Sequence, residues 1–537
     1  MSAPPEAEAE GSGERPRTLP DFHLWVPAPI ARLPEWLRVT GFLLIIGLIS
    51  LYVRTRFLNG QFWMDEAIAV GIASHHLSAI PGILRMDGSP PLYYVLLHFW
   101  MDAFGNTTSA THAMSIVFGM LTIPAGYWAG RTLLDKRTGM VAAVMFASSA
   151  FITQYSQETR MYSLMALLGL LATVGFVKAF VHRERRYAVL FVLAEVAMLY
   201  THAWGIFFGG ASFIALVLLY WRGDAEFRQS LIKDAAFSYG AIVVLFAPWL
   251  PTFLYQAGHT AAPWDTSPRF GAPIQISRNV LGGDQVTAPL VIAAVVGLWE
   301  LVIGHSRRSQ AAKVMWMFAA LLTFTLALGW VASQITPAWV PRYFAPVVPA
   351  MLLLIAIGVA RSGIVGVVAV IFMVFFLSHP SLYSFPHKSD MQQIAGELGP
   401  MLHRDDLVIV GQPESVPLAY YYLPGHLRYS STIGPVKDPS YMDWVNAQQR
   451  YLDANPWRVL PPLLNSLKKG QQLLFIRPLT EGLVNWQAPW SVLVRRRSAQ
   501  WSAIIAADKQ LVPEAVAPDD YLGACCIADS AILYRKS

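Results

Sequence analysis

An Asp-Glu pair and a single aspartate in the N-terminal part of the sequence have the residue types needed for acid–base chemistry on a hydroxyl group. Asp65 and Glu66 precede an apolar, helix-like segment, and Asp87 begins a Gly-Ser-Pro-Pro stretch. A carboxylate whose pKa is roughly 4 is ionised at neutral pH and can accept a proton from an acceptor hydroxyl. The alternatives are structural: Asp65 and Glu66 would complement a helix N-terminus, and Asp87 would help to form a turn.

Two arginines have the chemistry of a phosphate site. Arg160 and Arg342 each stand in a short connection between apolar runs, close to Tyr162 and Tyr343 respectively. The forked donors of a guanidinium group match phosphate oxygens, so this pair predicts a site for a phosphate or pyrophosphate at the membrane surface. Alternatively, each arginine would extend to lipid headgroups.

Two further polar residues accompany these arginines. Glu158 lies two residues before Arg160 and could position it, and His202 lies at a break between two apolar runs. At such a break His202 could contact the phosphate, ligate a metal, or bond backbone groups that the break leaves free. Asp87 could orient an acceptor or help to hold a divalent cation, because oxygen ligands suit hard metals. The sequence does not decide between these roles, so a divalent cation is an alternative and no metal ligand set is predicted.

The composition indicates that these residues belong to a membrane protein. Of 537 residues, 55% are hydrophobic and 14% are charged, whereas soluble domains contain about 25% charged residues. The net charge of +6 comes from short basic clusters between apolar runs, which argues against nucleic-acid binding and is typical of the positive-inside bias. Cys525 and Cys526 are adjacent and are the only cysteines, so we expect neither a disulfide framework nor a Cys-based metal site.

About eleven apolar runs qualify, or nearly qualify, as membrane spans, because a hydrocarbon core of about 30 Å needs roughly 17 to 25 helical residues. They are 39–53, 108–130, 138–154, 161–180, 187–201, 203–221, 235–255, 286–304, 314–332, 344–360 and 363–378. The run 90–104 is short and begins with two prolines. Counting it as a span would put basic clusters such as 183–186 outside, against the positive-inside rule. We therefore expect it to lie at the outer interface, with Tyr93, Tyr94 and Trp100 at headgroup depth.

The predicted fold is a polytopic α-helical membrane domain followed by a soluble α/β domain. Residues 1–22 contain almost no large apolar side chains and are expected to be a disordered cytoplasmic tail. Residues 23–378 form the transmembrane domain, whose external loop 54–107 carries interfacial helices. An odd number of spans from a cytoplasmic N-terminus then puts the α/β domain, 379–537, on the extracytoplasmic side of the cell membrane.

In order and register, the motifs between residues 40 and 350 resemble the GT-C class of membrane glycosyltransferases. They look most like the bacterial relatives of the protein O-mannosyltransferases and aminoarabinose transferases, which form glycosyltransferase family 39. An Asp-Glu pair in the first external loop is followed by an acid before Pro-Pro-Leu-Tyr-Tyr, and then by Gln-Glu-x-Arg-Met-Tyr. Tyr-Thr-His and Arg-Tyr-Phe-x-Pro complete the series.

This resemblance implies a GT-C-like fold and the transfer of a hexose or pentose from a polyprenyl-phosphate donor. The acceptor would be a hydroxyl of an extracytoplasmic glycan, lipid or protein, and an in-line attack would invert the anomeric centre. The implied roles are Asp65 as the base, Glu66, Asp87 and Glu158 as supporting acids, and Arg160, Arg342, Tyr343 and His202 as donor-phosphate contacts. Ser89 stands where the family often has His, and His112 where it usually has Arg, so the resemblance does not imply a metal in the first loop.

Two alternatives come from other classes of protein. A transporter or lipid flippase needs ionisable residues near the bilayer midplane and usually shows internal repeats. Glu195 is the main charged residue within a predicted span, and no repeat is evident. A non-catalytic envelope assembly protein would instead bind its partners through the outer domain.

Overall fold

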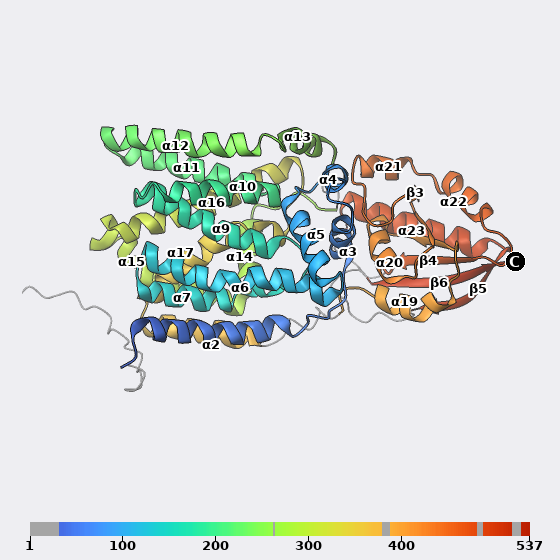
Figure 1. The fold of residues 1–537 in the computed structure, drawn as a ribbon, viewed down its shortest axis with the longest axis horizontal. Helices are drawn as coiled ribbons and strands as arrows, with labels where there is room; N and C mark the ends of the chain where they lie inside the picture. Colours follow the sequence, from blue (N-terminus) through green and yellow to red (C-terminus); the bar gives the residue numbers. More distant parts are fainter. Residues whose placement is uncertain (1–31, 261–263, 379–386, 481–486, 518–527) are drawn as a thin grey trace, which may run out of the picture.

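The protein consists of a helical bundle with a small α/β domain at one end (Figure 1). The computed structural model describes residues 32–260, 264–378, 387–480, 487–517 and 528–537. The expected tail, 1–22, and both cysteines lie outside the described residues.

The helices of the bundle correspond to the predicted apolar runs, except α14, which lies between the runs 235–255 and 286–304. They are α2 (Glu35–Thr55), α6 (Thr108–Leu133), α7 (Lys136–Ala147), α8 (Ala150–Tyr155), α9 (Tyr162–Phe176), α10 (Tyr187–Thr201), α11 (Gly205–Arg222), α12 (Ala225–Phe246), α13 (Leu250–His259), α14 (Ala272–Leu281), α15 (Asp284–Val302), α16 (Gln310–Ile335), α17 (Val348–Arg361) and α18 (Ile364–Ser378). Within the described residues, 7 of the helical segments are long and apolar enough to cross a membrane, and α10, α17 and α18 are apolar but shorter. The polytopic helical fold is confirmed, and the number of eleven spans stays a prediction.

Two predicted runs are each divided into two helices for local reasons. The run 138–154 breaks at Ser149, whose side chain accepts the N–H of Ile152 at 3.3 Å and so begins α8, as is typical of an N-cap serine. The run 235–255 breaks at Pro248, between α12 and α13, where proline cannot supply a backbone N–H to the helix.

Three short helices lie between the bundle and the α/β domain: α3 (Met64–Ala73), α4 (Ile80–Asp87) and α5 (Leu92–Phe104) (Figure 1). The run 90–104 therefore forms a short helix at this end of the bundle. Tyr93 and Tyr94 are both 0% exposed, so they contact other side chains, and their headgroup depth stays a prediction. They pack in the protein core, since α3 and α6 cover α5.

The α/β domain contains one mixed sheet in the order β3-β2-β1-β4-β6-β5. Its strands are β1 (Leu407–Val410), β2 (Arg428–Ser431), β3 (Gly434–Pro435), β4 (Gln472–Pro478), β5 (Leu511–Ala517) and β6 (Asp529–Lys536). Its helices are α19 (Met391–Leu398), α20 (Val416–Tyr422), α21 (Ala447–Asp453), α22 (Pro456–Asn465) and α23 (Pro489–Ala507). Strand β1 runs parallel to β2 and β4, and the other pairings are antiparallel.

The two faces of this sheet are covered by different helices because the strand residues alternate. Val408 and Val410 pack with α19 and α20, whereas Leu407 and Ile409 pack with α22 and α23. The first of these cores also contains Ala67 and Val70 from α3, together with Phe62, which lies two residues before this helix. The membrane domain and the α/β domain thus share a core through α3.

Close backbone contacts hold the two domains together. A side chain at Gly71 of α3 would meet the carbonyl oxygen of Ser440 at 1.8 Å, so this approach requires glycine. The N–H of Trp444 donates to the carbonyl of Met86 at 3.0 Å, and the Oγ of Ser389 donates to the carbonyl of Phe62 at 2.8 Å. These contacts fix the α/β domain directly over the end of the bundle.

The other end of the bundle carries basic residues. Glu35, at the start of α2, pairs with Lys136 at 3.1 Å and with Arg131 at 3.7 Å. The start of α2 lies at the end of the bundle that is farthest from the α/β domain (Figure 1).

Candidate active site

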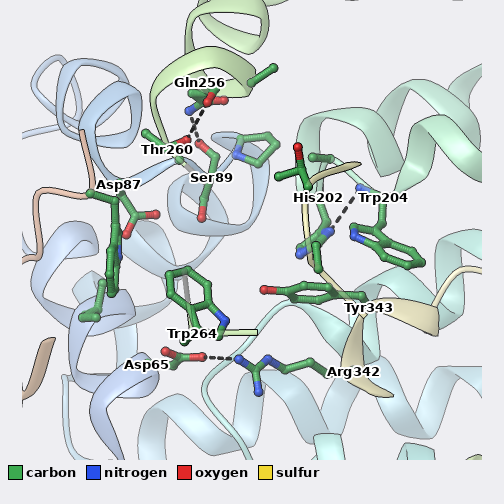
Figure 2. A pocket seen from close by; sticks show the side chains of 18 of the residues that line it. Asp65, Asp87, Ser89, His202, Trp204, Gln256, Thr260, Trp264, Arg342 and Tyr343 are labelled. Carbon is green, nitrogen blue, oxygen red and sulfur yellow. Dashed lines mark hydrogen bonds and ion pairs between the residues drawn. The ribbon is translucent and has the colours of Figure 1, made fainter. Parts of the chain in front are cut away.

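A cavity of about 680 Å³ lies where the bundle meets the α/β domain. It is bordered by the start of α3, the turn after α4, α13, and the connections that carry Arg160, His202 and Arg342. Six of the eight predicted site residues line it, and Figure 2 shows most of them: Asp65, Asp87, Arg160, His202, Arg342 and Tyr343. Segments that are far apart in the sequence therefore meet in one pocket.

The centre of this pocket is a carboxylate held by two guanidinium groups. The Oδ2 of Asp65 is 3.5 Å from Nη2 of Arg342 and 3.9 Å from Nη2 of Arg160. Nη1 of Arg160 also donates to the backbone carbonyl of Asp65 at 3.2 Å. Arg160 and Arg342 are 11% and 19% exposed. Both cations therefore line the cavity beside the carboxylate of Asp65.

Local structure orients the two arginines. Arg160 precedes α9, and its backbone carbonyl accepts a hydrogen bond from the Oγ of Ser115 at 3.3 Å. Arg342 lies in a single 3-10 turn that begins at Pro341. Its guanidinium carbon lies 5.3 Å from the ring centre of Trp63 and 5.5 Å from that of Tyr343. Such cation–π contacts hold the fork without consuming its hydrogen-bond donors.

His202 and Tyr343 stand side by side in the pocket, with ring centres 4.8 Å apart (Figure 2). Nδ1 of His202 accepts the backbone N–H of Trp204 at 3.2 Å, which satisfies one backbone donor at the break after α10. Burial, helped by the charges of Arg160 and Arg342, lowers the pKa of His202 to about 3. The ring is therefore neutral at pH 7 and adds no positive charge to the pocket.

Asp87 provides a second carboxylate in the cavity. It ends α4, and the following Gly88 has a left-handed backbone (φ 99°), as expected for a helix that stops at glycine. Burial raises the pKa of Asp87 to about 6, although Ser89 and Arg160 act in the opposite direction. Asp87 is thus a stronger base than an ordinary aspartate and is ionised at neutral pH.

Glu66 and Glu158 do not line the cavity. Glu66 is 0% exposed, and its Oε2 accepts the N–H of Trp63 at 3.1 Å, so the predicted helix-capping role applies to it. Glu158 is 6% exposed, and its Oε2 has no hydrogen-bond partner among the described residues. Burial raises the pKa of Glu158 above its ordinary value.

A buried ionic cluster surrounds Glu66, and its lysine was not anticipated from the sequence. Nζ of Lys388 lies 3.0 and 2.9 Å from the two carboxylate oxygens of Glu66 and donates to the carbonyl of Gln157 at 2.8 Å. Nε2 of His112 is 2.7 Å from Oε1 of Glu66. Burial alone raises the pKa of Glu66, but the charges of Lys388 and His112 outweigh it and hold the pKa below its usual range. The residue next to Asp65 is therefore fixed by the segment that leads into the α/β domain.

The sequence also did not indicate the wall that the α/β domain contributes to the cavity. Gln412, Glu414, Trp444, Trp490 and Ser491 all line it. They come from unrelated stretches of an ordinary-looking soluble domain, so no spacing pattern marks them.

No group of three or more His, Cys, Asp or Glu side chains is arranged to hold a metal ion within the described ranges. Asp65, Asp87 and Glu414 are the acidic side chains that line this pocket.

Comparisons with known proteins agree with the resemblance found in the sequence. Residues 88–251 match the family described as dolichyl-phosphate-mannose-protein mannosyltransferase. This range includes Arg160 and His202 and excludes Asp65 and Arg342. No curated protein matches the chain by sequence.

Two solved structures of ArnT from Cupriavidus metallidurans share the fold. The apo structure has a TM-score of 0.58 at 14% identity, covering 92% of this chain and 98% of that one. The structure bound to undecaprenyl phosphate has a TM-score of 0.57 at 14% identity, with coverage of 93% and 98%. The chain thus has the fold of ArnT over nearly its whole length, with the soluble domain included in the match.

Proposed function

We propose that this protein transfers a sugar from a polyprenyl-phosphate donor to a hydroxyl of an extracytoplasmic acceptor, with inversion. The observation that carries the proposal is the position of Asp65, within 3.5 and 3.9 Å of two guanidinium groups in one cavity. A base and two phosphate ligands are the groups that such a transfer needs.

In this reaction the acceptor oxygen forms a bond to the anomeric carbon while the bond from that carbon to the phosphate oxygen breaks. Asp65 takes the acceptor's proton, and the bonding electrons leave with the polyprenyl phosphate. Arg160 and Arg342 stabilise the charge that develops on the leaving phosphate. Tyr343 and the neutral His202 contact the same group by hydrogen bonds.

The relation to ArnT supports the donor class. One of its structures holds undecaprenyl phosphate, and it shares this chain's fold over nearly its whole length. We propose a polyprenyl-phosphate donor for this chain as well, because two arginines line the cavity at the end of the helical bundle. This relation concerns the donor lipid and does not identify the sugar or the kind of acceptor.

The arginine pair provides a direct test. Replacing Arg160 or Arg342 by Lys keeps one positive charge but removes the planar fork, so the affinity for undecaprenyl phosphate should fall by about tenfold, the equivalent of one charge-assisted hydrogen bond. Binding is measured with the purified protein in nanodiscs. Arg278→Lys, outside the cavity on α14, is the matched control and should bind as the wild type does. Unchanged affinity in both pocket variants would contradict the phosphate role.

The orientation is proposed to put the α/β domain outside the cytoplasm and the basic end of the bundle inside. A reporter enzyme that is active only outside the cytoplasm should work when fused after Ser537 and fail when fused near Arg185, because basic connections stay on the cytoplasmic side. The reverse pattern of reporter activity would place Asp65 in the cytoplasm and overturn the proposal.

A further inference from the structure

The α/β domain forms one wall of the cavity, and this wall has features that the transfer reaction itself does not use. Gln412 and Glu414 precede α20, Trp444 precedes α21, and Trp490 lies in the first turn of α23. Nε2 of Gln412 lies 3.7 Å from the sulfur of Met64. The wall therefore begins beside the residue that precedes Asp65.

Glu414 has one carboxylate oxygen in use and one without a partner. Its Oε1 accepts hydrogen bonds from Gln412 and from Nε1 of Trp490, both at 2.9 Å. Its Oε2 is buried and has no hydrogen-bond partner among the described residues, and the side chain is only 6% exposed. A buried acceptor without a donor is destabilising by about 1–3 kcal/mol, so such a group is expected to have a ligand or another function.

Three tryptophans lie beside Glu414: Trp444 and Trp490 belong to the α/β domain, and Trp264, from the connection between α13 and α14, packs against Trp444 and extends the wall. The ring centres of Trp264 and Trp444 are 4.6 Å apart, and those of Trp444 and Trp490 are 5.1 Å apart. All three line the cavity. Nε1 of Trp264 is also buried without a partner in the described part of the chain. The wall thus presents aromatic faces together with one free acceptor and one free donor.

This combination matches the surface of a sugar ring. A pyranose has an apolar face of C–H groups that packs on indole, and a rim of hydroxyls that need an acceptor and a donor each. An extended peptide would instead need a row of backbone partners, which this wall does not present. A lipid chain would leave the carboxylate of Glu414 without a hydrogen bond.

We infer that this wall binds the acceptor as a saccharide, with a hydroxyl donating to Oε2 of Glu414 and a ring face against Trp444. The inference rests on the proposed transferase function. The acceptor, rather than the donor sugar, is assigned to the wall because the donor phosphate belongs to Arg160 and Arg342 in the membrane domain. Asp65 pairs with these arginines and follows Met64, whose sulfur contacts Gln412 of the wall, so the base is next to both groups.

The test uses the full-length protein in nanodiscs and two probes. One probe is undecaprenyl phosphate, and the other is a size-fractionated mixture of oligosaccharides released by mild acid from the envelope of the source organism. Binding is followed by quenching of tryptophan fluorescence. Glu414→Gln keeps the shape of the side chain and the two bonds to its Oε1 but removes the charge on the free oxygen. It should weaken oligosaccharide binding about tenfold and leave undecaprenyl phosphate binding unchanged.

Two further variants complete the design. Trp444→Phe keeps an aromatic ring of smaller area and should weaken oligosaccharide binding about threefold. Glu397→Gln makes the same change on the exposed side of α19 and should behave as the wild type does. Arg342→Lys should show the opposite pattern, with weaker undecaprenyl phosphate binding and unchanged oligosaccharide binding.

The outcomes separate this inference from the proposed function. If the wild type binds undecaprenyl phosphate but no oligosaccharide fraction, the saccharide inference is wrong and the transferase proposal stands. The inference is also wrong if Glu414→Gln and Trp444→Phe bind oligosaccharide as tightly as the wild type. If neither probe binds, both proposals fail together.

Discussion

Asp65→Asn should reduce sugar transfer by about 10² or more and at the same time tighten the binding of undecaprenyl phosphate about fivefold. The loss of transfer follows from the loss of the base, since an amide keeps the size of the carboxylate but cannot take the acceptor's proton. The gain in affinity follows from the two distances between Asp65 and the arginines. Asp65 and the phosphate compete for the same two guanidinium groups. Removing an ion pair of ~1 kcal/mol should therefore raise the affinity for the phosphate about fivefold.

The two readouts of this variant exclude simpler explanations. A variant that merely misfolds would lose both transfer and phosphate binding. Asp87→Asn is the matched control, because Asp87 lies in the same cavity without an ion pair to either arginine within 4.0 Å among the described contacts, and its phosphate affinity should change by less than about twofold. If Asp65→Asn kept its transfer rate, the general-base mechanism would be abandoned, and transport or envelope assembly would become the better account.

Lys388→Met should destabilise the protein by about 3–5 kcal/mol, because it leaves the carboxylate of Glu66 buried without its cation. Glu66 is 0% exposed and Lys388 is 3% exposed, so water cannot replace the lost partner. The measurement is the midpoint of thermal unfolding in nanodiscs. Sugar transfer should fall as well, because Glu66 caps the helix that carries Asp65.

A double variant distinguishes the charge effect from lost packing. Lys388→Met combined with Glu66→Gln removes both charges, so most of the lost stability should return. Glu66→Gln alone leaves the charge of Lys388 buried without its anion, so it should destabilise the protein about as much as Lys388→Met does. If the single variants melted at the wild-type temperature, the ion pair would contribute nothing. If the double variant were the sum of the two single losses, the cluster would act through packing alone.

Much of the membrane domain could be predicted because its signals are local. Each apolar run corresponds to one helix or to two consecutive helices, since burial in lipid or protein requires contiguous apolar residues. The breaks were missed because one serine cap or one proline is enough to divide a run. Tyr93 and Tyr94 were assigned to the headgroups because a short run led by prolines is typical of an interfacial helix, and only the tertiary structure reveals that other helices cover them.

The site was predictable to the extent that it depends on motifs in external connections. Asp65, Asp87, Arg160, His202, Arg342 and Tyr343 were selected for their types and sidedness, and they line one cavity. Lys388 could not be selected, because its partner Glu66 is 322 residues away and an isolated lysine after an apolar run looks like a headgroup contact. The tryptophans of the wall had no motif at all, because they come from three separate segments, before α14, before α21 and at the start of α23, which only the tertiary fold brings together.

Helix α3 contributes side chains to the cores of both domains, and this has a consequence for how the protein is made. Phe62, Ala67 and Val70 complete the core of the α/β domain, whereas Ile68 and Ile72 belong to the core of the bundle. The ribosome produces α3 early and the partners of its outer side more than 300 residues later. Until Lys388 and the α/β domain have emerged and folded, the outer side of this helix is uncovered and Glu66 lacks its lysine. The cavity is therefore assembled only after the α/β domain has been synthesised, and a chain without that domain lacks both the wall with Gln412, Glu414 and Trp444 and the lysine that pairs with Glu66.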